Sequence, residues 1–70
     1  MDVVGFAKYM YKKCGELETE KARMLSLGYA KTYDEYKRGV GYIEGLASVR
    51  EEVKAFLDKL HDDDDGETWN

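Results

Sequence analysis

Few residues in this 70-residue chain are of the types that carry catalytic or metal-binding chemistry. His61, the only histidine, precedes the four consecutive aspartates Asp62 to Asp65. Such groups bind divalent cations, but a flexible run lacks the fixed geometry that a metal site requires. Cys14, the only cysteine, lies on an apolar stripe with no histidine near it, as expected of a small buried hydrophobe rather than a nucleophile. We therefore expect no catalytic residue, no metal and no cofactor, and interpret the chain as non-enzymatic.

The acidic residues are concentrated at the C-terminal end. Residues 61–70 contain five acids and no Lys or Arg: Asp62, Asp63, Asp64, Asp65 and Glu67. These are five of the 15 acids, so the other ten stand against all 11 basic residues, and residues 1–60 carry about +1. A run of one charge sign is usually solvated, and we expect a disordered acidic tail. Trp69 is either a ring that docks in a partner's pocket while the carboxylates meet a basic rim, or part of a solubilising tail.

Apolar residues recur every three to four positions in two long segments, which is typical of amphipathic helices. The first helix is predicted from about residue 2 to about residue 27, with Asp2 as its N-cap and Gly28 at its end. The second is predicted from about residue 33 to about residue 60. It opens with a capping box, in which Thr32 and Glu35 satisfy free backbone donors.

Two helices of similar length joined by a short turn predict an all-α fold, an antiparallel, coiled-coil-like two-helix hairpin. We expect the hairpin to occupy residues 1–60, with its turn at residues 28–32, and the acidic tail to occupy residues 61–70. Two helices alone bury one stripe each, and a chain of this size is marginally stable. The hairpin is therefore expected to be oligomeric or bound to a partner.

The position of the turn also predicts how the helices face one another. With the turn near residue 30, position i faces roughly position 61−i. Val3 and Ala7 then lie near Leu57 and Val53, in one continuous apolar seam.

The second helix carries a stripe of small residues. Gly41, Gly45 and Ser48 fall within about 60° of one another at 3.6 residues per turn, roughly opposite Ile43 and Ala47. Small residues let another backbone approach closely, so this stripe is a candidate contact with a partner. The alternatives are tolerated surface glycines, a thinning of the helix where the first helix crosses it, or a hinge.

Six tyrosines are a second candidate for partner contact, because tyrosine joins a large ring to a polar tip. Tyr9 and Tyr42 project toward the outer face and are the candidate interface residues. Tyr29, Tyr33 and above all Tyr36 are expected to cap the open end of the hairpin core.

Lys21 and Arg50 interrupt the apolar stripes of their helices. Each either lays its stem on apolar surface and keeps its charge in water, or forms a salt bridge between subunits that sets register. Arg50 is expected near Met10 and Tyr11, where a cation–π contact is possible.

Composition excludes several classes of function. No run of about 18 apolar residues is present to span a membrane, and no basic segment precedes an apolar one as in a signal peptide. No basic stripe rises above the mixed background, so direct nucleic-acid binding is not expected. The single cysteine fits a reducing setting, and the expected location is a virion or the host cytoplasm.

One motif resembles a known group of proteins. Tyr36 is followed by Gly41-x-Ile43-x-Gly45-Leu46 and then a charged amphipathic helix. This pattern is similar to that of small helical proteins encoded by tailed bacteriophages, often among genes for virion structure and assembly. The resemblance covers about residues 32–58 and implies a phage origin; the first helix and the acidic tail lie outside it.

These observations favour a phage structural or assembly protein that acts by helix packing against itself or other virion proteins. The alternative is a phage-encoded inhibitor of a host enzyme, whose acidic tail imitates the charge of nucleic acid. A weaker option is an antitoxin-like partner protein.

Overall fold

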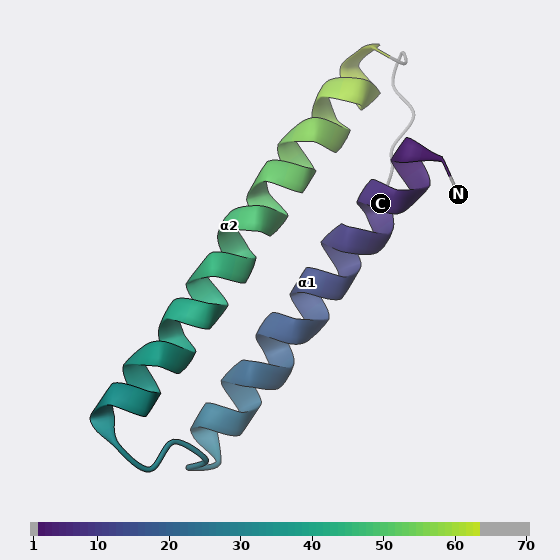
Figure 1. The fold of residues 1–70 in the computed structure, drawn as a ribbon. Coiled ribbons are helices and arrows are strands. Elements are labelled where there is room, and N and C mark those ends of the chain that lie inside the picture. The colour runs from purple at the N-terminus through teal and green to yellow at the C-terminus, as the bar shows by residue number, and fades with distance from the viewer. Residues whose placement is uncertain (1, 64–70) are drawn as a thin grey trace.

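Two antiparallel helices, the second longer than the first, lie side by side (Figure 1). The computed structural model describes residues 2–63, and the side chains of residues 2–60. Helix α1 spans Val3–Ser26 and helix α2 spans Tyr33–Asp63. At 1.5 Å per residue, 31 helical residues extend about 46 Å. The molecule measures 49 × 18 × 16 Å, so the second helix sets its length. The predicted all-α helical hairpin is confirmed.

The predicted N-cap of α1 is present. The Asp2 carboxylate accepts a hydrogen bond of 2.7 Å from the Gly5 amide and so satisfies one of the free donors of the first turn. At the other end, Gly28 has φ of 82°, a conformation that costs glycine little. The amides of Gly28 and Tyr29 return to the carbonyls of Leu25 and Met24, which closes the helix.

The start of α2 is a variant of the predicted capping box. The Glu35 amide donates to the Thr32 hydroxyl at 3.1 Å, as predicted. The Glu35 carboxylate accepts from the Lys31 amide at 2.7 Å, one residue earlier than the usual reciprocal bond. The side chain therefore ties the helix to the preceding loop.

The end of α2 differs from the prediction. The helix continues to Asp63, so its last three residues come from the segment assigned to the acidic tail. Asp62 and Asp63 are thus helical in their backbone. The remaining acidic-tail residues, Asp64, Asp65 and Glu67, and the candidate docking residue Trp69 lie outside the described residues.

The helices are shifted relative to the predicted register. The expected partners of Gly15, Lys21 and Leu25 are residues 46, 40 and 36. The structure instead places them beside Arg50, Tyr42 and Gly39, two to four residues further along α2. Val3 was expected in the seam but is 66% exposed, whereas Ala7 is buried as predicted.

Gly39 lies in close contact with helix α1 near the turn. It is buried, and a Cβ atom at this position would lie 2.8 Å from Cδ2 of Leu25. The absence of a side chain at Gly39 therefore lets Leu25 lie directly against the backbone of α2. This contact near the turn fixes the level at which the two helices begin to pair.

Candidate protein-interaction surface

The hairpin buries very little of its apolar surface. Within residues 2–60 the buried apolar side chains are Ala7, Cys14 and Leu57, the last only 2% exposed. Eleven large apolar or aromatic side chains in the same range are exposed. They are Val3, Val4, Phe6, Tyr9, Leu27, Tyr29, Tyr33, Tyr36, Tyr42, Val49 and Phe56. Single exposed apolar residues are ordinary, but a contiguous group marks an interaction site.

Many apolar side chains gather on one side of the hairpin, which we call the apolar face. Its members are Phe6, Met10, Leu17 and Met24 of α1, and Tyr42, Leu46, Val49, Val53 and Phe56 of α2. At 100° per residue the four α1 side chains fall within about 40° and the five α2 side chains within about 80°. The lining of one shallow groove includes Leu17, Met24 and Tyr42, so both helices contribute to the same face.

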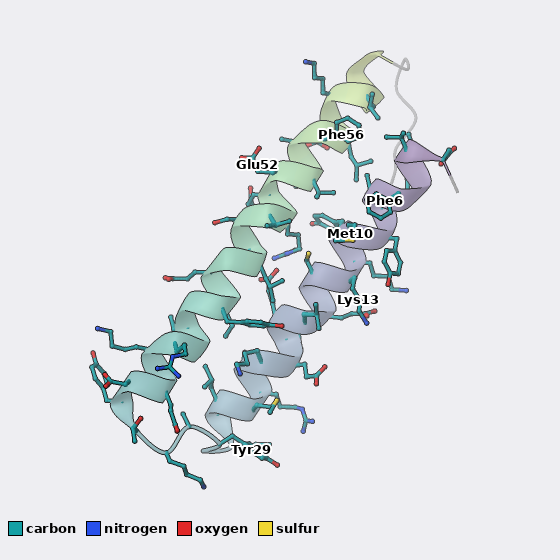
Figure 2. The ribbon with its side chains drawn as sticks, in the orientation of Figure 1. Phe6, Met10, Lys13, Tyr29, Glu52 and Phe56 are labelled. Carbon is teal, nitrogen blue, oxygen red and sulfur yellow. The ribbon has the colours of Figure 1, made fainter. Side chains whose placement is uncertain are left out.

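Figure 2 looks onto the apolar face. Phe6 and Met10 project from α1 and Phe56 projects from α2 on this side of the ribbon, with Lys13 and Glu52 at the flanks. Phe6 is 55% exposed, Val49 48% and Phe56 41%. The face is thus an apolar strip with charged borders, which is the organisation of a protein interface.

The opposite face is closed by a polar cluster that spans the two helices. The Arg50 guanidinium donates from Nε to Glu18 Oε2 at 2.6 Å and from Nη2 to Glu18 Oε1 at 3.4 Å. It also lies 5.3 Å from the centre of the Tyr11 ring, the cation–π contact that the sequence predicted. The hydrogen bond to Glu18 raises the pKa of Arg50 above its usual value. The ion pair of Arg50 is therefore within the chain and not between subunits.

Lys21 has a similar role near the turn. Its ammonium lies 5.4 Å from the centre of the Tyr42 ring, across the two helices. Tyr42 is therefore partly used within the hairpin, although half of it remains exposed at the apolar face. Tyr9 is also half exposed, on the outer side of α1. As partner-binding residues, both remain predictions.

The stripe of small residues does not contribute to the hairpin. Gly41, Gly45 and Ser48 are exposed, and a Cβ atom at Gly41 or Gly45 would meet no atom within 4 Å. The explanation that these two glycines thin the helix for α1 is wrong; that role belongs to Gly39. Gly39 was not singled out from the sequence, although its position on the inner side of the helix was an available signal.

The three tyrosines around the turn are largely exposed. Tyr29, Tyr33 and Tyr36 each expose about half of their surface or more, so they leave the end of the core open. A groove of about 490 Å³ lies here, and Tyr29, Arg38 and Tyr42 are among its lining residues.

The described residues offer little for chemistry. Cys14 is buried, as predicted, and no group of three His, Cys, Asp or Glu within the described part could hold a metal ion. Within residues 2–63, neither helix combines the length and the apolarity that a membrane span requires.

Comparison with protein families, curated proteins and solved structures finds no match to this chain.

Proposed function

We propose that the protein is a non-enzymatic structural or assembly protein of a tailed phage, which acts by packing its apolar face against itself or other virion proteins. The observation that carries this proposal is the continuous apolar strip along both helices, including Phe6, Val49 and Phe56. Burying such a strip is favourable by about 25 cal/mol per Å². A hairpin with a small core gains stability from that burial, so binding and folding support one another.

The phage assignment rests on the motif that begins at Tyr36. Two of its members, Gly41 and Gly45, are exposed at the border of the apolar face, and Leu46 belongs to that face. Ile43 lies toward α1 and is half-buried. A motif that joins a core residue to surface glycines suits a helix that packs on two sides. The expected setting is a virion or the infected cell, without a cofactor or direct contact to nucleic acid.

The test compares two neighbouring substitutions in a tagged protein. Phe56→Asp places a charge on the apolar face, whereas Ala55→Asp places the same charge on the exposed side of α2 that lies away from it. The wild-type protein and the Ala55→Asp control should co-purify in fixed ratio with capsid, portal or tail proteins from infected cells and virions. Phe56→Asp should lose them. Equal recovery with all three proteins would show that the apolar face is not the binding surface.

A second candidate function is supported by the charge distribution. Residues 61–70 hold five acids and no base, while residues 1–60 are nearly neutral. A host-enzyme inhibitor that imitates nucleic-acid charge would depend on this tail. Replacing Asp62 to Asp65 by Asn and Glu67 by Gln would abolish binding by an inhibitor but leave most of the affinity of an assembly protein. Recovery of one host enzyme, with absence from virions, would favour the inhibitor.

A further inference from the structure

We infer that the apolar face binds a second copy of this chain, and that two hairpins form an antiparallel four-helix bundle with α1 against α1 and α2 against α2. The twofold axis passes beside Leu17 and crosses the helices at right angles. This inference rests on the proposed function, because it assigns a partner to the same face.

The exposed area is consistent with one such interface. The chain exposes 5483 Å², whereas a compact monomer of its mass, 8.1 kDa, is expected to expose about 4,500 Å². Part of this larger area is the apolar face, and a standard interface buries roughly 800 Å² on each partner. A second hairpin, equally long and equally apolar on one side, has the right shape to cover it.

The sequence of α1 is complementary to itself when it is turned around Leu17. In an antiparallel pair centred there, Met10 lies opposite Met24 of the second copy. Lys13 lies within one residue of the level of Glu20 of the second copy and on the same flank of the strip, and the symmetry makes this pair twice. Opposite charges on the flanks of an apolar strip set register and partner choice, as in coiled coils. An unrelated partner would give no reason for this match within a single helix.

The sequence of α2 has the same property, with its centre between Ala47 and Ser48. Leu46 then lies opposite Val49 of the second copy, and Arg38 lies within one residue of the level of Phe56. A guanidinium over an aromatic ring is a favourable contact. Gly45, where an added Cβ atom would meet no atom of the hairpin within 4 Å, falls near this centre and leaves room for the second backbone.

The two centres lie at the same level of the hairpin, as one twofold axis requires. The evidence is the contact between Gly15 and Arg50, where a Cβ atom on the glycine would lie 3.7 Å from Cδ of the arginine. Moving two residues toward the turn from each position reaches Leu17 in α1 and Ser48 in α2. The symmetric centres of the two helices are therefore side by side.

The other twofold arrangement, with α1 against α2 of the second copy, satisfies fewer charges. It brings Lys13 near Glu52, but at the observed register it sets Glu20 opposite Gly45 and Arg38 opposite Leu27. The arrangement with like helices facing gives both Glu20 and Arg38 a favourable partner.

The first measurement is the oligomeric state by sedimentation equilibrium. The wild-type protein and Ala55→Asp should be dimers, and Val49→Asp should be a monomer, with circular dichroism to establish that each variant remains helical. A folded wild-type monomer at all accessible concentrations would overturn the inference. The proposed function would survive that result if the wild-type protein still bound virion proteins through the apolar face.

A charge exchange on α1 tests the arrangement. Lys13→Glu alone and Glu20→Lys alone should each weaken the dimer by about tenfold, since each places like charges together at two sites. The double variant Lys13→Glu/Glu20→Lys should return to within about threefold of the wild-type dissociation constant. A dimer without this rescue would overturn the α1–α1 pairing.

Disulfide formation is a second test of where the twofold axis crosses α1. Leu17→Cys brings two new thiols together beside the axis and should yield a covalent dimer under mild oxidation. Met10→Cys, whose partner is Met24 of the second copy, is the matched control and should not; both variants keep the buried Cys14. Linkage through Met10→Cys in place of Leu17→Cys would overturn the assigned centre.

Discussion

The two faces of the hairpin use their long side chains in opposite ways. On one face Arg50 reaches across the groove, pairs with Glu18 and lies over Tyr11, so that charged and aromatic groups seal the junction of the helices. On the apolar face, Phe6 and Phe56 leave about half of their surface in water. The face sealed by its own side chains is suited to solvent. The face without such a seal is the one that we propose as the binding surface.

The glycines of α2 repeat this contrast on a smaller scale. Gly39 lies on the side of α2 that faces α1, and the Leu25 side chain occupies the space beside it. Gly41 and Gly45 lie on a side of α2 where an added Cβ atom would meet only open space. Each costs about 1 kcal/mol of helix stability relative to alanine. Only at Gly39 does a contact within the hairpin offset that cost.

The largest expected effect comes from the core beneath both faces. Leu57→Ala should lower the free energy of unfolding by about 2–5 kcal/mol, because Leu57 is almost fully buried and its removal leaves a cavity. For a chain this small, such a loss approaches the whole stability, so helicity by circular dichroism should be largely lost at 25 °C. Val3→Ala, at an exposed position of α1, is the control and should melt like the wild type. A folded Leu57→Ala protein with an unchanged melting temperature would contradict the assigned core.

Alanine substitutions at Gly39 and Gly41 should change the free energy of unfolding in opposite directions. Gly39→Ala introduces a Cβ atom 2.8 Å from Leu25, and overpacking of this kind typically costs about 1–3 kcal/mol. Gly41→Ala meets no atom within 4 Å in the hairpin and should stabilise the isolated chain by up to about 1 kcal/mol. Urea unfolding at low protein concentration measures both. If Gly39→Ala proved the more stable variant, the close approach of the helices at this point would be wrong.

The difference between Gly39 and Gly41 also shows how far the sequence could predict the structure. The helix starts and the end of α1 were predictable from single residues, since Asp2, Thr32, Glu35 and Gly28 act on backbone groups a few positions away. The register was not, because it depends on contacts between side chains far apart in the chain.

The apolar face itself was only partly foreseen. The exposed apolar edges at Phe6, Val49 and Phe56 follow from helical periodicity. That these edges share one face, while Arg50 and Glu18 seal the other, required the relative rotation of the two helices. The same knowledge separates Gly39, which serves the hairpin, from Gly45, which remains available.

The polar cluster of Arg50, Glu18 and Tyr11 should contribute less to the free energy of unfolding than the core does. Arg50 and Glu18 expose 35% and 15% of their side chains, so solvent weakens the attraction, and we expect a coupling free energy of about 1 kcal/mol. A double-mutant cycle with Arg50→Met and Glu18→Gln measures it. The coupling should fall in high salt, because screening acts on exposed charges. Additive single substitutions would show that the ion pair does not hold the helices together.

The smallest effect is expected from the pair of Lys54 and Asp58 on α2, whose charged atoms lie 2.9 Å apart. The hydrogen bond to Asp58 raises the pKa of Lys54 above its usual value, so the folded chain holds this proton more tightly than the unfolded chain. The pair therefore stabilises the fold below the ordinary lysine pKa, and its contribution disappears as the pH rises through the raised value. Both side chains are half exposed, which keeps the contribution small. The melting temperatures of the wild type and Lys54→Gln should differ slightly at neutral pH and converge once the pH has risen past the raised pKa of Lys54. A difference that grew with pH would mean that the charged lysine opposes folding.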